Sequence, residues 1–173
     1  MLIAMAGLPG TGKSTIAGHI GARLGAAVVS VDPIEAAILT AGIDSDQPTG
    51  LAAYLVAETL AESVLSAGHS IVVDAVNAVE PAREQWVGLA ARQGVELRFV
   101  EVMCSDGELH LKRLAARAAK LPHLAEPNRH AVEQSLEDYS AWRGQSAAAP
   151  RLRLDTSHSV ESNVEAALAF LTG

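Results

Sequence analysis

One segment near the start of the chain carries the residues best suited to hold phosphate. Residues 7–14 read Gly-Leu-Pro-Gly-Thr-Gly-Lys-Ser and fit the pattern G-x-x-x-x-G-K-[ST] at every required position. Glycines let the backbone turn sharply and aim N–H groups at phosphate oxygens, and the helix that follows presents its positive end to the same anion. Lys13 can reach the β- and γ-phosphates, and the Ser14 hydroxyl can ligate magnesium. The expected nucleotide-binding residues are Gly7, Leu8, Pro9, Gly10, Thr11, Gly12, Lys13, Ser14 and Thr15.

Two aspartates follow apolar stretches that are typical of buried strands. Asp32 comes after Ala-Val-Val-Ser-Val, and Asp74 comes after Ser-Ile-Val-Val. Ligands of open α/β sheets bind at the carboxyl ends of the strands, so we expect both carboxylates beside the phosphates. We predict that Asp74 holds magnesium through a water and that Asp32 accepts the proton of a hydroxyl attacking the γ-phosphate. The structural alternatives are a helix cap before Pro33 for Asp32 and a strand-end cap for Asp74.

Basic residues that can neutralise a transferring phosphoryl group lie later in the chain. Arg113 and Arg117 are four residues apart, which places them on one helix face. We predict that Arg113 and Arg117, in preference to Arg129, stabilise the transition state. Arg117 is also predicted to contact the nucleotide. The alternative is a solvated helix face. Thr156 follows an apolar strand pattern and is predicted to border the nucleotide base.

The elements that must position these residues alternate between strands and helices. Continuous Val/Ile/Leu-rich runs are typical of strands covered on both faces, and β-α-β alternation predicts a parallel sheet between helices. Glycines 68 and 94 stand where helix C-caps are expected, and Pro81 fits a first helical turn. The expected strands are Leu2–Ala6, Ala27–Val31, Ser70–Asp74, Glu96–Met103 and Arg151–Asp155. The expected helices lie near 13–24, 50–67, 80–93, 106–119, 129–143 and 160–171, all in a single domain over 1–173.

Composition and charge exclude several classes of protein. The chain has 173 residues, 49% of them hydrophobic and 3% aromatic, so the core must consist mainly of Ala, Val, Leu and Ile. A net charge of −7 and few aromatics make nucleic acid an unlikely partner. The only cysteine, Cys104, can form neither an intramolecular disulfide nor a cysteine metal cluster. No apolar run approaches the length of a membrane span, and we expect a cytoplasmic protein without a membrane partner.

With these residues in place, the chain resembles a known family. It is similar to the small bacterial P-loop kinases of the zeta-toxin and chloramphenicol-phosphotransferase type, often described as AAA-family ATPases and related to 5′-hydroxyl polynucleotide kinases. The resemblance implies a three-layer α/β/α P-loop NTPase fold with a five-stranded parallel sheet in the order 2-3-1-4-5. It also implies that Asp32 is the base, that 112–130 forms a helical lid carrying arginines, and that Asn77 is structural or faces the substrate. The segments that carry it are 7–14, 30–32, 72–77, 81–86, 104–106, 113–117 and 154–156.

One departure from this family bears on the acceptor. Related polynucleotide and adenylylsulfate kinases tend to have an arginine a few residues after the aspartate that corresponds to Asp32. Here Glu35 occupies that neighbourhood. An acidic residue there disfavours an anionic acceptor and favours a cationic or neutral polyol.

The expected activity is ATP-dependent phosphorylation of a hydroxyl on a small molecule, with Mg²⁺. The alternatives are a polynucleotide 5′-hydroxyl or nucleotide kinase, and an ATP-binding or ATP-hydrolysing module without a dedicated acceptor. A GTPase would need an Asn-Lys-x-Asp segment, which the sequence lacks. GTP as the donor, the identity of the acceptor, and the choice between monomer and homodimer stay open at this point.

Overall fold

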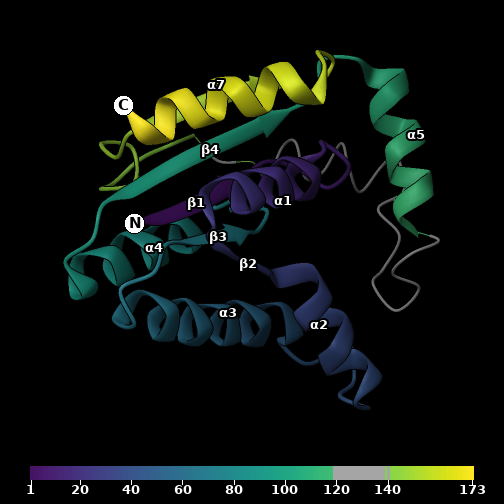
Figure 1. The fold of residues 1–173 in the computed structure, drawn as a ribbon. Helices are drawn as coiled ribbons and strands as arrows, with labels where there is room; N and C mark the ends of the chain where they lie inside the picture. The colour runs from purple at the N-terminus through teal and green to yellow at the C-terminus, as the bar shows by residue number, and fades with distance from the viewer. Residues whose placement is uncertain (119–138, 140) are drawn as a thin grey trace.

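The computed structural model describes residues 1–118, 139 and 141–173, and it is built on a five-stranded parallel sheet (Figure 1). The strands are β1 (Leu2–Ala6), β2 (Ala27–Ser30), β3 (Ile71–Asp74), β4 (Leu97–Met103) and β5 (Arg151–Asp155). Their order is β2-β3-β1-β4-β5, and all neighbouring pairs are parallel. The predicted strands and the predicted order 2-3-1-4-5 are confirmed.

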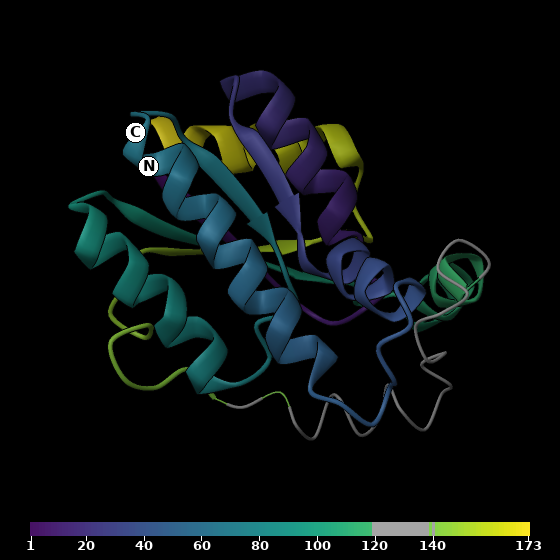
Figure 2. The ribbon, with the colours of Figure 1, turned by 90° about the horizontal axis from the view of Figure 1, so that it is seen from below.

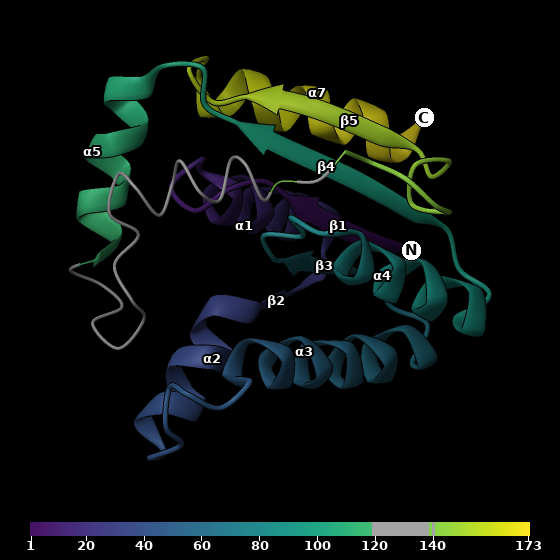
Figure 3. The same ribbon diagram turned by 180° about the vertical axis from the view of Figure 1, so that it is seen from behind.

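Helices cover both faces of this sheet. Figures 2 and 3 show α1 (Lys13–Leu24) and α7 (Val160–Thr172) on one face, and α3 (Thr49–Ser66) and α4 (Glu80–Gln93) on the other. Helix α2 (Val31–Thr40) packs against α3, and α5 (Gly107–Ala118) stands beyond the end of the sheet to which the β4 arrow points. This is the expected three-layer arrangement. Within the described ranges, no helix is long and apolar enough to cross a bilayer.

Alternation along the central strands divides the core into two halves. In β1, Leu2 and Ala4 face the α3/α4 layer, whereas Ile3 and Met5 face the α1/α7 layer, as the two-residue period of a strand requires. Helix α3 packs through alanines spaced four residues apart, which bring its backbone close to the sheet. Aromatic residues are few, yet Trp86 and Phe99 are fully buried in the α3/α4 half.

Two predicted elements differ from the structure. The strand expected to end at Val31 ends at Ser30, and residues 31–40 form α2, which was not predicted. Pro33 falls in the first turn of this helix, where its missing N–H costs nothing, and Ile34 and Ile38 pack against the core. The helix expected over 129–143 lies mostly outside the described residues. Tyr139 and residues 141–143, which are described, are not helical.

A buried carboxylate joins β4 to the chain that precedes β5. Glu101 is 4% exposed, and its Oε1 accepts hydrogen bonds from Tyr139 Oη at 2.9 Å and Trp142 Nε1 at 3.1 Å. Its Oε2 lies 3.2 Å from Arg153 Nε and 3.8 Å from Arg151 Nε. Burial alone would raise the pKa of Glu101, but these two hydrogen bonds and the two arginines outweigh it and hold the pKa below its ordinary value.

We expect Glu101→Gln to destabilise the fold in a pH-dependent way. A carboxyl whose pKa is lowered by folding adds stability above the unfolded pKa of about 4.3, and this stability is lost as the pH falls through the lowered folded pKa. The variant should therefore lose about 1–3 kcal/mol of unfolding free energy at pH 7, and the difference from wild type should shrink below about pH 4.

Urea unfolding between pH 3 and pH 7 measures this difference. Glu96→Gln is the matched control, because Glu96 forms an exposed ion pair with Arg98 at 2.7 Å and should matter by less than about 1 kcal/mol. A difference for Glu101→Gln that does not change with pH would contradict the electrostatic explanation.

Candidate active site

The loop between β1 and α1 is shaped by its glycines and by its fit against the sheet. Gly7 has a φ of 136°, and a Cβ there would lie 2.1 Å from the carbonyl oxygen of Val102. Gly12 has a φ of 94° and is the N-cap of α1, which carries no acidic residue in its first turn. The positive end of α1 therefore faces the loop without a local carboxylate to offset it, which is the arrangement that binds an anion.

Side chains inside the loop hold its curvature. The Lys13 ammonium donates a hydrogen bond to the Leu8 carbonyl at 3.0 Å, and the Thr11 hydroxyl donates to the same oxygen at 2.8 Å. Lys13 is only 6% exposed. A buried ammonium interacts strongly with anions, so Lys13 adds positive charge where a phosphate would bind.

A cavity of about 490 Å³ brings together most of the predicted site residues. It joins the phosphate loop to both aspartates, to α5 and to the end of β5. Gly7, Leu8 and Thr11 are buried and shape the loop without lining this cavity. The predicted residues that line it are Pro9, Gly10, Gly12, Lys13, Ser14, Thr15, Asp32, Asp74, Arg113 and Thr156.

Both aspartates lie at the carboxyl edge of the sheet, as their positions after strands predict. Asp74 is the last residue of β3, is 6% exposed, and accepts a hydrogen bond from the Ser30 hydroxyl at 3.1 Å. Asp32 lies in the first turn of α2, and the N-cap of that helix is Ser30. The alternative role of Asp32 as the helix cap is therefore wrong.

Tyr54 on α3 reports the negative charge at this edge. Burial raises the pKa of the Tyr54 phenol to about 12, although the Asn77 N–H, which donates to its oxygen at 3.0 Å, acts in the opposite direction. The carboxylates of Asp32, Asp74 and Glu35 add to the rise. All three acidic groups thus act on one point between α3 and the sheet.

Glu35 and Asn77 serve the fold directly. Glu35 Oε1 accepts a hydrogen bond from the Thr49 hydroxyl at 2.9 Å, at the start of α3, and Glu35 does not line the cavity. A carboxylate at this position stabilises α3 through its interaction with the positive N-terminal end of the helix.

Asn77 is fully buried, adopts a positive φ of 49°, and links the Met5 carbonyl to the Trp86 indole. Of the two roles implied for Asn77, the structure shows the structural one.

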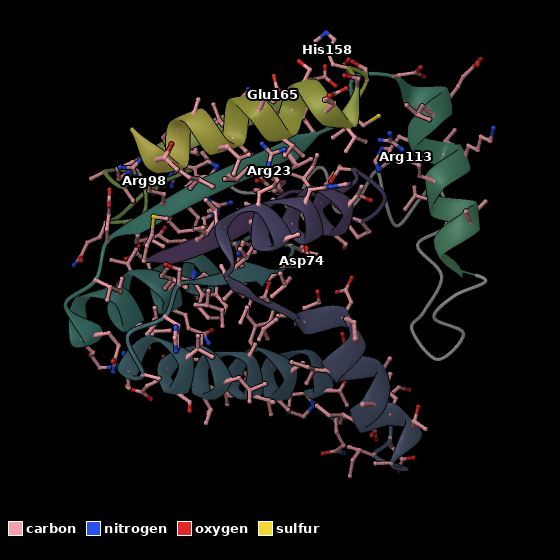
Figure 4. The ribbon with its side chains drawn as sticks, viewed as in Figure 1. Arg23, Asp74, Arg98, Arg113, His158 and Glu165 are labelled. Atoms are coloured by element: carbon pink, nitrogen blue, oxygen red, sulfur yellow. The ribbon has the colours of Figure 1, made fainter. Side chains whose placement is uncertain are left out.

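Helix α5 rests on the phosphate loop and on the end of β5. Arg113 donates to the Thr156 hydroxyl at 2.8 Å and to the Thr156 carbonyl at 3.2 Å, and Figure 4 shows it pointing from α5 toward the sheet. The Thr156 hydroxyl also lies 2.6 Å from the Thr11 carbonyl. His110, also on α5, places Nε2 2.7 Å from the Pro9 carbonyl.

The predicted lid and its second arginine are described only in part. Residues 112–118 belong to α5, and the remainder of the predicted lid, with Arg129, lies outside the described residues. Arg117 lies in the last part of α5, and its role toward the nucleotide stays a prediction.

The oxygen donors of the cavity fit magnesium bound together with a nucleotide. Ser14 and Asp74 both line the cavity, and hydroxyl and carboxylate oxygens are the donors that magnesium prefers. In the part of the chain that the structure describes, no group of three His, Cys, Asp or Glu residues could hold a metal ion. The protein side of such a site is thus incomplete without phosphate oxygens, as is usual for nucleotide-bound magnesium.

Several lining residues were not predicted from the sequence. These are Ile16, Ser30, Ala116 and Val160. Ser30 stands before Asp32 at a position typical of helix caps, so its residue type could have indicated a helix start at the site. The residue types of Ala116 and Val160 could not have indicated a place at the site, because small and β-branched apolar residues occur in many helices.

Comparison with known proteins is consistent with this geometry. The model of a family described as "AAA domain" matches residues 2–142, whereas no curated protein sequence matches the chain. A sugar kinase from Janibacter sp. HTCC2649 has a TM-score of 0.70 at 18% identity, over 98% of this chain and 93% of that one. Chaetomium thermophilum Kti12 in complex with ADP-AlF3 has a TM-score of 0.72 at 16% identity, over 100% of both chains. The Mycobacterium tuberculosis APS kinase CysC in complex with AMPPNP and APS has a TM-score of 0.67 at 19% identity, over 99% and 97%.

Proposed function

Because the chain belongs to the AAA domain family and has the fold of P-loop kinases, we propose that it transfers the γ-phosphate of ATP to a hydroxyl of a small molecule. The observation that carries this proposal is the single cavity that joins the phosphate loop, Asp32 and Asp74. A nucleotide-binding module needs only the phosphate loop and Asp74. A kinase also needs a base on the acceptor side, and Asp32 supplies it.

The nucleotide base belongs at the α5 end of the cavity. Arg113, Ala116, Thr156 and Val160 line that end, and they offer a planar cation, apolar surface and a hydroxyl. A guanidinium can stack on a purine, and the apolar side chains cover its faces. This supports a purine nucleotide as donor, with ATP proposed ahead of GTP.

The reaction we propose is an in-line transfer. The loop amides and Lys13 hold the β- and γ-phosphates, and Ser14 and Asp74 would hold magnesium, which neutralises phosphate charge when bound. Asp32 takes the proton of the acceptor hydroxyl as its oxygen attacks phosphorus and the bond to the β-phosphate oxygen breaks. Arg117, one helical turn beyond Arg113, stabilises the charge on the transferring group and helps to exclude water, while Arg113 stays with the nucleotide base.

The wall on the acceptor side argues for an uncharged or cationic acceptor. No Lys, Arg or His occurs between Arg23 and His69, the stretch that forms β2, α2 and α3. Of the acidic residues in the same stretch, Asp32 lines the cavity, whereas Glu35 bonds Thr49 and Glu58 pairs with Arg92 away from it. The stretch thus places the carboxylate of Asp32, and no cationic side chain, at the cavity, which disfavours an anionic sugar or a nucleic-acid end. This favours a cytoplasmic sugar or amino-sugar kinase.

The test is an ATP-consumption screen with magnesium and purified protein. The panel contains sugars, aminoglycosides, nucleosides and 5′-hydroxyl oligonucleotides, with amine, neutral and acid forms of one sugar matched in size. We expect a small hydroxyl compound to stimulate consumption and to gain one phosphoryl group by mass spectrometry. Faster transfer to the oligonucleotide than to every small molecule would overturn the choice of acceptor. Slow hydrolysis that no acceptor changes would favour a nucleotide-binding module.

A further inference from the structure

Ser30 occupies a helix N-cap but does not cap its helix. It precedes α2 with an extended backbone, and its side chain makes no capping hydrogen bond. Serine is preferred at this position because its oxygen normally accepts a hydrogen bond from a backbone N–H of the first turn. Ser159, the N-cap of α7, does this and accepts from the Ser162 N–H at 3.2 Å. The hydroxyl of Ser30 is therefore directed elsewhere.

That hydroxyl contacts the carboxylate predicted to hold magnesium. Ser30 Oγ donates to Asp74 Oδ2 at 3.1 Å, and Ser30 itself lines the cavity beside Lys13 and Ser14. The sheet fixes this contact, because Ser30 and Asp74 are register partners at the carboxyl ends of β2 and β3. Two neighbouring strand ends thus present a carboxylate whose second oxygen, Oδ1, is not used by this bond.

We propose that Ser30 is a positioning residue for metal binding: it fixes the Asp74 carboxylate so that Oδ1 faces the water through which Asp74 would hold nucleotide-bound magnesium. The inference rests on the proposed function of the site, and it assigns a role to a residue with no place in the phosphate-binding pattern. Hydrogen bonds to metal-binding carboxylates orient them, and losing such a partner typically costs 10–100-fold in metal affinity. In this arrangement the Ser30 hydroxyl bonds to Asp74 and does not cap α2.

The competing explanation is a structural strut between β2 and β3. The backbone hydrogen bonds of the two strands already join these ends, so a strut would add little. The two explanations differ in what they predict for Ser30→Ala. A strut predicts lower thermal stability with unchanged metal binding. A positioning role predicts nearly unchanged stability with weaker metal binding.

The experiment compares Ser30→Ala, Ser30→Thr and Ser159→Ala with wild type. Binding of a fluorescent ATP analogue is titrated with Mg²⁺, without any acceptor, to give an apparent metal constant. Nucleotide affinity in EDTA and the Tm of the metal-free protein are measured in parallel. We expect Ser30→Ala to weaken the metal constant by about 10-fold or more while its EDTA affinity and Tm stay near wild type.

The other two variants serve as rescue and control. Ser30→Thr keeps the hydroxyl and should retain most of the metal affinity. Ser159→Ala removes a true cap and should lower the Tm by about 2–4 °C with the metal constant unchanged.

Three results would overturn the proposal. The first is an apparent Mg²⁺ constant in Ser30→Ala equal to that of wild type, and the second is a decrease in the Tm of Ser30→Ala as large as that of Ser159→Ala. The third is nucleotide binding by the wild-type protein that does not depend on Mg²⁺. Because no acceptor is present, a protein that fails as a kinase in the substrate screen can still pass or fail this test.

Discussion

Replacement of Lys13 by alanine is expected to lower kcat/KM for phosphoryl transfer by at least about 10²–10³-fold and to weaken ATP binding. The Lys13 ammonium is buried in the loop, where it is held 3.0 Å from the Leu8 carbonyl. A charge in this place acts on the phosphates through little water, so its removal should cost more than the loss of a surface charge. Transfer to the acceptor found by the screen and nucleotide affinity by calorimetry measure the two effects.

Lys112→Ala is the matched control for this substitution. Lys112 lies exposed on α5, one position before Arg113, and its loss should leave transfer near wild type. Equal losses in the two variants would mean that general charge near α5, and not the position of Lys13 in the loop, controls the reaction. Wild-type activity in Lys13→Ala would remove the basis for a P-loop mechanism.

Asp32→Asn is expected to reduce kcat by about 10²–10⁴-fold while the affinity for ATP changes by less than about twofold. The amide has the shape of the carboxylate but cannot accept the proton of the acceptor hydroxyl. Asp32 lies on α2, whereas the nucleotide's purine is proposed to bind beside α5, and Figure 1 shows these two helices apart. Single-turnover transfer and calorimetric ATP binding separate the two quantities.

Asp44→Asn controls for charge on the same wall. Asp44 is exposed in the stretch between α2 and α3, so this substitution removes one negative charge without touching the cavity. Much weaker ATP binding in Asp32→Asn, with kcat at saturating ATP unchanged, would contradict the assignment of Asp32 as the catalytic base. It would place Asp32 on the nucleotide side instead.

Local patterns predicted the phosphate loop and the strand ends well. The loop follows from a motif whose every residue has its own steric or electrostatic reason, and Gly7 and Gly12 adopt the positive φ angles that the motif requires. Asp32 and Asp74 could be placed together because parallel strands end at one edge of a sheet. The continuous apolar runs of β1 and β3 correspond to strands buried on both faces.

The missed features depend on how segments distant in sequence meet. Helix α2 begins with a capping residue, an acidic residue and a proline, which are signals of a helix start, but Val31 also continued the apolar pattern of the strand before it. The contacts of His110 with Pro9 and of Glu35 with Thr49 depend on where α5 and α3 lie relative to the loop. No spacing within the sequence encodes such a contact.

The bond between Thr156 and the Thr11 carbonyl bears on where this protein can be cut. Thr156 follows β5, and β5 is paired with β4, so residues beyond 142 complete both the sheet and the floor of the phosphate loop. A fragment trimmed to the matched span of 2–142 would lose β5, α7 and this brace together. For expression, fusion or split-protein work, we therefore expect the folding unit to extend through α7, so that a tag or linker is placed after that helix and not before β5.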